Sequence, residues 1–353
     1  MNSLTIIIPT YERHFYAKRT LSYWSGKSAN IIALDGSELP LNITFLNSLS
    51  DNIEYIHLPG KSFYQRIKTV YKRIHTKFTM LHADDEFFLP SGLSKCIEEI
   101  EANDLVCCLG RCLSFNSEKS TVNASPWHPL HTSFEGYNLL EESPFVRILK
   151  HLNPYICTTF FSVFKTDILV NNFTFFIDND VDALLFELAF AVCSVFQGKS
   201  KVINHLSWLR SLENPSHYIQ DKKKGKRPKE AYDKILEKGF HPNSSINMLA
   251  QHLNSLNDDY SIKILEDVIY SAFRSYAYHA KLSYEIAHLF DKVKMPMSSH
   301  KKELLEMIGK WRGTDFEVED LSLINSAKVW RKKGIESDEN EILEIQKHII
   351  KFN

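Results

Sequence analysis

Three adjacent carboxylates, Asp84, Asp85 and Glu86, stand between the apolar segments MLHA and FFLP. Adjacent like charges repel, so this arrangement needs a compensating partner. Clustered oxygens without basic neighbours suit Mg²⁺ or Mn²⁺, which proteins usually hold with one or two carboxylates plus substrate phosphates. The alternative is a solvated helix N-terminus, where the helix dipole favours acidic side chains. The triplet alone leaves both interpretations open.

A second acidic cluster, formed by Asp178, Asp180 and Asp182, precedes the apolar stretch LLFELAFAVCSVF. Acidic side chains at the start of a helix are favoured by its dipole. One of them can also cap the helix, and such capping is compatible with catalysis by another. The pattern therefore predicts a helix that begins with acidic residues, and it is compatible with a catalytic role for one of these carboxylates.

The composition limits the class of protein. The chain has 353 residues, 44% of them hydrophobic and 24% charged, which is typical of a folded protein with one large or two smaller domains. The formal net charge of −1 supplies no basic field for nucleic acid. Glycine-rich phosphate loops are absent from the sequence, which disfavours a kinase or a dinucleotide oxidoreductase.

The sequence also bears on the compartment. The first residues lack the basic segment and cleavage site of a signal peptide, and the apolar stretch 184–196 is too short to cross a bilayer. We expect a cytoplasmic protein and leave open peripheral contact with the inner face of the membrane. Six cysteines without paired metal-ligand spacing predict free, mostly buried thiols in a reducing compartment.

Strands and helices alternate through the first 115 residues. Such alternation favours a parallel, doubly wound sheet, in which ligands bind beyond the carboxyl ends of the strands. The distinctive polar residues of this region all follow a predicted strand. The predicted strands cover residues 5–9, 30–35, 53–59, 78–83 and 105–115. The predicted helices cover residues 14–25, 62–75 and 93–102.

The rest of the chain differs in pattern. Residues 116–165 look irregular, with a predicted strand at 155–165. The basic run KKKGKRPK at 222–229 predicts a linker or a mobile loop. Beyond it, helical spacing of apolar residues predicts an all-helical C-terminal subdomain over 230–353.

The segments IIIPTYER, IIALDGS and MLHADDEFFLP, in this order, resemble the nucleotide-sugar-binding half of GT-A-fold glycosyltransferases of the family 2-like kind. The resemblance covers residues 4–115 well and 150–217 loosely. It implies a GT-A-like (Rossmann-like) α/β fold with a mixed, mostly parallel sheet flanked by helices. The catalytic domain would span residues 1–221, with a nucleotide-sugar half at 1–115 and an acceptor half at 116–221.

The resemblance implies a glycosyltransferase that moves a sugar from a nucleotide-diphosphate-sugar to an acceptor hydroxyl, in surface polysaccharide or glycoconjugate synthesis. Asp35 would bond the nucleobase edge, with an Asx turn against Gly36 as the alternative. Lys61 and Arg66 would meet the diphosphate or ribose, and a plain surface charge is the equal alternative for Arg66. The residues that would lie against the base and ribose are Thr10, Tyr11 and Arg13, with no role assigned to Glu12.

The metal motif of these enzymes, of Asp-x-Asp type, falls either on His82 and Asp84 or on Asp84 and Glu86. We favour the second pairing, so Asp84 and Glu86 are the predicted ligands of Mn²⁺ or Mg²⁺. Asp85 would contact the substrate and point away from one of its neighbours if the segment is extended. The departure at His82 leaves open whether the metal is strictly required.

The acceptor half of the resemblance assigns the remaining candidates. Asp180 matches the base that deprotonates the acceptor hydroxyl, and Asp182 is second. A single carboxylate with in-line attack would invert the anomeric configuration. Arg210 and His217, with His205 next, would close over the diphosphate.

The predicted partners are a glycan or lipid-linked acceptor and, through the C-terminal helices, a second copy of the chain. The basic run 222–229 would be a lid, a contact with anionic lipid, or a solvated loop. Two other functions remain. A sugar-phosphate nucleotidyltransferase usually needs glycines in its first loop, and PTYERHFYAKR has none. A non-catalytic scaffold would keep the acids as relics and use the helical tail to bind proteins.

Overall fold

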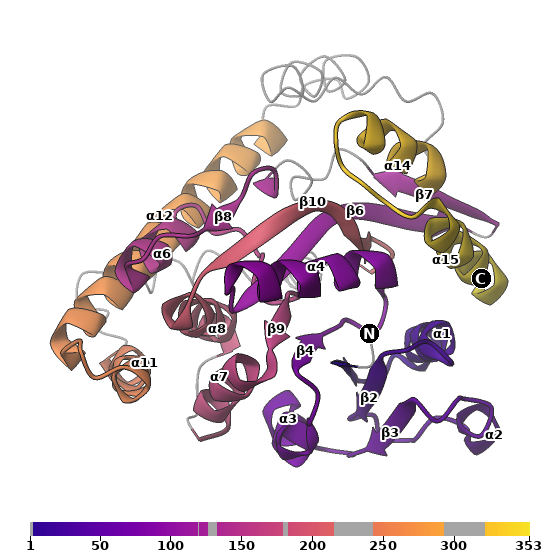
Figure 1. Cartoon of the computed structure of the whole chain (residues 1–353), viewed down its shortest axis with the longest axis horizontal. Helices are drawn as coiled ribbons and strands as arrows, with labels where there is room; N and C mark the ends of the chain where they lie inside the picture. The colour runs from indigo at the N-terminus through magenta and orange to yellow at the C-terminus, as the bar shows by residue number, and fades with distance from the viewer. Residues whose placement is uncertain (1–2, 119, 126–132, 179–182, 215–242, 293–321) are drawn as a thin grey trace.

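The computed structural model describes residues 3–118, 120–125, 133–178, 183–214, 243–292 and 322–353. Within these ranges a single ten-stranded mixed sheet forms the centre of the molecule, and helices cover both of its faces (Figure 1). Along the sheet the strands follow the order β3-β2-β1-β4-β9-β6-β10-β5, while β7 pairs with β6 and β8 with β10.

The first four strands pair in parallel with one another. β1 pairs in parallel with both β2 and β4, and β2 pairs in parallel with β3. The run Ile6, Ile7 and Ile8 is buried on both faces, which explains why this strand reads as continuous rather than alternating. The strands are β1 (Leu4–Thr10), β2 (Asn30–Asp35), β3 (Ile53–His57) and β4 (Phe78–Leu81).

The helices between these strands return the chain across the sheet. The best-defined start belongs to α3, where Ser62 and Gln65 form a capping box. Helix α4 begins at Pro90, a position at which the missing N–H of proline costs nothing. The elements are α1 (His14–Trp24), α2 (Ile43–Leu46), α3 (Phe63–Val70) with the 3₁₀ turn Tyr71–Arg73, and α4 (Pro90–Asn103).

The long strands β6 and β10 in the second half of the sheet run in the same direction as β1 and β4. β9 (Val163–Lys165) is antiparallel to both β4 and β6 (Cys107–Glu118), so β4 and β6 run the same way. β10 (Ser200–Ser211) is parallel to β6. The carboxyl ends of β1, β2, β4, β6 and β10 therefore meet at one edge of the sheet. The short strands are β5 (Phe87–Phe88), β7 (Thr121–Ser125) and β8 (Asn138–Leu139).

The predicted strand at 155–165 is mostly wrong, because only residues 163–165 pair with the sheet. The residues before them form turns, in which Thr158 N–H bonds the Ile156 carbonyl and Ser162 N–H bonds the Thr159 carbonyl. Helices α6 (Pro144–His151), α7 (Thr166–Asp178) and α8 (Ala183–Gln197) share one of the two hydrophobic cores.

The described C-terminal helices divide between two hydrophobic cores. α11 (Asn243–Leu256) and α12 (Ile262–Lys292) join the core that contains α3, α6, α7 and α8. α14 (Leu323–Lys332) and α15 (Glu339–Phe352) join the other core, beside α1, α4 and β7 (Figure 1). The predicted range 230–353 is helical wherever it is described apart from turns and short connections, but its helices pack on two faces of the sheet rather than only on each other.

Polar contacts connect α15 to α1, to the turn after α1 and to α4. His348 Nε2 lies 2.7 Å from the carbonyl oxygen of Arg19, and Ser91 donates to Glu341 through its N–H and its hydroxyl. Lys27 pairs with Glu344 at 2.6 Å. None of the helices in the described part of the chain is long and apolar enough to cross a membrane.

Candidate functional site

The acidic triplet lies at the sheet edge where the strands end. β4 stops at Leu81, and the chain turns through residues 82–86, with Glu86 N–H facing the Ala83 carbonyl, before β5 begins. Asp84, Asp85 and Glu86 are only 4%, 8% and 6% exposed. The alternative of a solvated helix N-terminus is therefore wrong, since α4 starts later, at Pro90.

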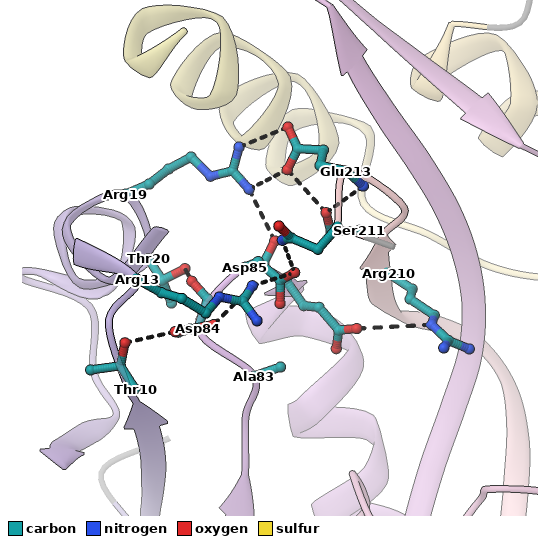
Figure 2. Close-up of polar contacts among 12 residues, drawn as sticks. Thr10, Arg13, Arg19, Thr20, Ala83, Asp84, Asp85, Arg210, Ser211 and Glu213 are labelled. Carbon is teal, nitrogen blue, oxygen red and sulfur yellow. Dashed lines mark hydrogen bonds and ion pairs between the residues drawn. The ribbon is translucent and has the colours of Figure 1, made fainter. Parts of the chain in front are cut away.

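Arg13 lies between two of the acids (Figure 2). Its Nη2 is 3.2 Å from Asp84 Oδ1 and 2.7 Å from Asp85 Oδ2. Thr10, at the end of β1, donates its hydroxyl to Asp84 Oδ2 at 2.7 Å, and Asn214 donates to Asp85 Oδ2 at 2.6 Å. The guanidinium of Arg13, in the turn after β1, therefore compensates the negative charges of Asp84 and Asp85, in the turn after β4.

The electrostatics of the pair follow from burial and this ion pairing. Burial raises the pKa of Asp84 to about 6, although the charge of Arg13 and the hydroxyl of Thr10 oppose the rise. Burial by itself would lower the pKa of Arg13, but the charges of Asp84 and Asp85 outweigh it, so that pKa is raised. The guanidinium of Arg13 therefore remains charged and faces the two acids Asp84 and Asp85.

Glu86 belongs to a different group of side chains. Trp208 Nε1 donates to Glu86 Oε2 at 2.7 Å, and Arg210 Nε lies 4.0 Å from Glu86 Oε1. The metal motif of the resemblance would pair Asp84 with Glu86, and alternate side chains of this kind share a side only where the segment is extended. Residues 84 and 85 form a turn. The guanidinium of Arg13 therefore bridges Asp84 and Asp85, while Glu86 contacts side chains of β10.

The donor chemistry of the pair is compatible with a hard divalent ion. Arg13 shows that a positive group fits between Asp84 and Asp85. In the described part of the chain no three His, Cys, Asp or Glu side chains gather in a group that could hold a metal. At this place Asp84 and Asp85 would supply two carboxylates, and phosphate oxygens of a ligand would complete the shell, as is usual for Mg²⁺.

His82 has a structural role at the position where the metal motif departs. The side chain is 1% exposed. Its Nε2 faces the indole N–H of Trp24 at 3.2 Å, and its Nδ1 faces the Ala83 carbonyl. These contacts require the proton on Nδ1, and burial lowers the pKa of His82 to about 4. His82 is a neutral, buried packing residue.

Asp35 and Arg66 stabilise the edge from within. Asp35 is fully buried and accepts hydrogen bonds from Ser37 N–H at 2.8 Å and from the Tyr55 hydroxyl at 2.5 Å. The first of these bonds is the Asx turn that was the alternative interpretation. A contact of Asp35 with a nucleobase stays a prediction.

Arg66 is 6% exposed, so the interpretation as a plain surface charge is wrong. Its Nη1 donates to the carbonyls of Thr10 and Leu34, which joins the ends of β1 and β2. A Cβ at Gly36 would come within 3.0 Å of the guanidinium, so glycine allows this approach. In this arrangement Arg66 supports the turns that carry the site.

The remaining candidates are spread around the edge. Tyr11 is 60% exposed, and Lys61 is also exposed, so both can meet a ligand from solvent. Arg210 is partly exposed and lies over the Trp208 ring. His205 lies on β10 five residues before Arg210, and its side chain faces Glu336. Asp180, Asp182 and His217, and the basic run 222–229, lie outside the described residues.

Arg19 and Glu213 are site residues that sequence reasoning missed. Arg19 is fully buried, and its guanidinium donates to Glu213 at 2.6 and 3.1 Å and to the Asp85 carbonyl at 3.0 Å (Figure 2). Thr20 donates its hydroxyl to the Asp84 carbonyl at 2.6 Å. In the sequence Arg19 is one of several charged residues near the start of the chain, and no local signal reveals a partner 194 residues away.

The pKa of Glu86 predicts a pH dependence of stability. Burial raises this pKa to about 8, whereas the unfolded chain loses the proton near the ordinary value for a glutamate. The folded state therefore binds more protons between these values, and the free energy of unfolding should fall as pH rises, by at most about 1.4 kcal/mol per pH unit. Asp84 contributes in the same direction up to about pH 6.

Urea denaturation between pH 5 and pH 8 measures this slope. Glu86→Gln should flatten it, because the substituted side chain cannot titrate, while Glu38→Gln, at an exposed glutamate, should leave it unchanged. Equal slopes in Glu86→Gln and the unmodified chain would contradict the prediction.

Comparison with solved structures identifies the fold. A crystal structure of residues 1–349 of TarS, a glycosyltransferase from S. aureus, matches with a TM-score of 0.50 and 12% identity over 99% of this chain and 92% of that chain. The same TarS fragment in complex with UDP-GlcNAc gives a TM-score of 0.43 and 14% identity over 72% of this chain and 73% of that chain. No family model and no curated protein sequence matches. The chain therefore has a GT-A-like fold, with a mixed, mostly parallel sheet flanked by helices and further C-terminal helices.

Proposed function

We propose that this chain is a glycosyltransferase that moves a sugar from a nucleotide-diphosphate-sugar to an acceptor hydroxyl. The observation that carries the proposal is the buried carboxylate pair Asp84–Asp85, ion-paired with the partly exposed Arg13 at the edge where the strand ends of a GT-A-like sheet converge. In open sheets of this kind ligands bind beyond the carboxyl ends of the strands. The proposed setting is synthesis of a surface polysaccharide or glycoconjugate.

The described residues have distinct tasks in this proposal. Asp84 and Asp85 would hold the divalent cation, which when bound supplies positive charge to the leaving diphosphate. Tyr11 offers an exposed ring to the nucleoside. Arg210, partly exposed on β10, offers a guanidinium whose fork geometry suits phosphate oxygens. The buried groups His82, Arg66 and Arg19 hold the turns that present these side chains.

The acceptor side of the proposal rests on the acidic cluster that precedes α8. The acceptor hydroxyl must lose its proton as it attacks the anomeric carbon, and Asp180 is the proposed base, with Asp182 second. One carboxylate acting in a single displacement would invert the anomeric configuration. The acceptor is a glycan or a lipid-linked sugar.

Isothermal calorimetry with donors tests the proposal. The chain is titrated in Mn²⁺ with UDP-, GDP-, CDP- and TDP-linked sugars, UDP-GlcNAc among them. We expect one nucleotide to bind in the micromolar range, corresponding to roughly 8 kcal/mol, and the affinity to fall when EDTA removes the metal. If no compound of the panel binds, the scaffold interpretation replaces the enzyme. Release of pyrophosphate from a nucleoside triphosphate and a sugar phosphate would instead indicate a nucleotidyltransferase.

A further inference from the structure

A cavity of about 480 Å³ opens at the same sheet edge as the acidic pair. Its walls come from the start of α1, the ends of β6 and β10, and the end of α15. Because β6 and β10 run in the direction of β1 and β4, this cavity and the Asp84–Asp85 pair face the same side of the sheet. Its volume is in the range of small-ligand sites.

The lining combines aromatic rings with neutral polar groups. Phe15 is 46% exposed, and its ring meets that of Tyr16 edge to face at 5.1 Å. Asn116 and Asn353 are exposed and bring side-chain amides, which both donate and accept hydrogen bonds. An aromatic wall facing amide groups suits a ligand with an apolar face and a rim of hydroxyl groups, which is the form of a sugar ring.

The charges of the lining select against an anionic ligand. Among the residues that the structure describes, neither Lys nor Arg lines the cavity, and the ionisable side chains of this lining besides Tyr16 are the acids Glu118 and Glu213. Glu213 is paired with the buried Arg19, whose side chain has no exposed surface to offer a ligand. A phosphate group bound here would lie close to the carboxylates of Glu118 and Glu213, and their negative charge favours a neutral ligand.

Two contacts connect the cavity to the acidic pair. The Tyr16 ring lies 5.0 Å from the guanidinium carbon of Arg13, which pairs with Asp84 and Asp85. Glu213 binds Arg19, and Arg19 donates to the Asp85 carbonyl. Only one side chain therefore separates each of these cavity walls from the carboxylate pair.

We propose that this cavity binds a neutral sugar unit of the acceptor, with Phe15 as the platform for the sugar ring and Asn116 as a partner of its hydroxyl groups. The proposal rests on the proposed glycosyltransferase function and assigns the chemical class of the acceptor. It excludes an acceptor whose unit at this position carries phosphate.

A printed array of neutral oligosaccharides, acidic oligosaccharides and polyol phosphates tests the proposal on the full-length chain. We expect retention of at least one neutral glycan. Phe15→Ala and Asn116→Ala should each lower its signal about fivefold, the equivalent of one aromatic or hydrogen-bonding contact. Val146→Ala, at a side chain of similar exposure (47%) on α6, is the matched control and should stay within about twofold.

Three results would overturn the proposal: no neutral glycan retained, retention of phosphate-bearing compounds alone, or equal signals for Phe15→Ala and Val146→Ala. Thermal melting shows whether each variant is folded, and Asn116→Ala, at an exposed residue, provides the second arm. Donor calorimetry on the same preparations separates the two proposals. Donor binding without glycan retention overturns only the sugar subsite, whereas glycan retention without any donor binding overturns the glycosyltransferase and the acceptor role.

Discussion

Asp180→Asn is expected to slow glycosyl transfer at least about 100-fold, the usual contribution of a general base. Donor affinity should stay within about twofold, because a base that acts on the acceptor hydroxyl contributes mainly to the transition state. Product formation under saturating donor measures the first quantity, and calorimetry measures the second. Asparagine keeps the size of the side chain and removes its ability to take a proton.

Asp182→Asn is the matched control for this substitution, since it changes the same residue type two positions along the chain. It should leave turnover within about tenfold of the unmodified chain, as capping contributes to stability rather than to proton transfer. Undiminished turnover in Asp180→Asn would remove Asp180 as the base. A large loss in Asp182→Asn alone would move that role to Asp182. The anomeric configuration of the product tests inversion separately.

The double variant Asp84→Asn/Asp85→Asn is expected to weaken Mn²⁺-dependent donor binding at least about tenfold, because both carboxylates that can hold the cation become neutral. Glu86→Gln should change it by less than about threefold. Glu86 contacts Trp208 and Arg210, and a glutamine oxygen can still accept from the indole N–H. Calorimetry with and without EDTA gives the metal-dependent part of the affinity.

The comparison distinguishes two arrangements of the acidic triplet. If Glu86→Gln is as damaging as the double variant, the metal pair is Asp84 with Glu86, as the resemblance to the Asp-x-Asp motif implies. If neither variant responds to metal, the cation has no part in donor binding. Thermal melting is needed alongside, since the double variant leaves Arg13 without its two acidic partners.

The location of the site could be predicted because it depends on local patterns. Continuous β-branched runs identified β1 and β2, and the change to polar residues marked where each strand ends. Parallel strands present their carboxyl ends at one edge of the sheet. This rule predicts that Thr10, Arg13 and Asp84 lie close together, even though no contact between them is known from the sequence. The structure confirms this grouping at distances of 2.7 to 3.2 Å.

The partners within the site could not be predicted in the same way. The turn at residues 84 and 85 changes which acids share a side, and it depends on the pairing of β5 with β10, more than 100 residues later in the chain. Arg19 is a charged residue of α1, yet it is fully buried: its guanidinium pairs with Glu213, and its carbonyl oxygen contacts His348 of α15. The burial of a charged side chain is decided by elements that pack over it, and helical periodicity carries no information about them.

The sequence by itself determined the alternating elements, the sheet edge that carries the candidate site and the acids that stand there, because backbone periodicity and strand ends are properties of neighbouring residues. Only the tertiary structure decided that Arg13 bridges Asp84 and Asp85, that Glu86 turns to Trp208, and that the C-terminal helices divide between two cores. These features arise from contacts between distant segments, such as the contact of Arg19 with His348, 329 positions later, and they form only when the whole chain packs.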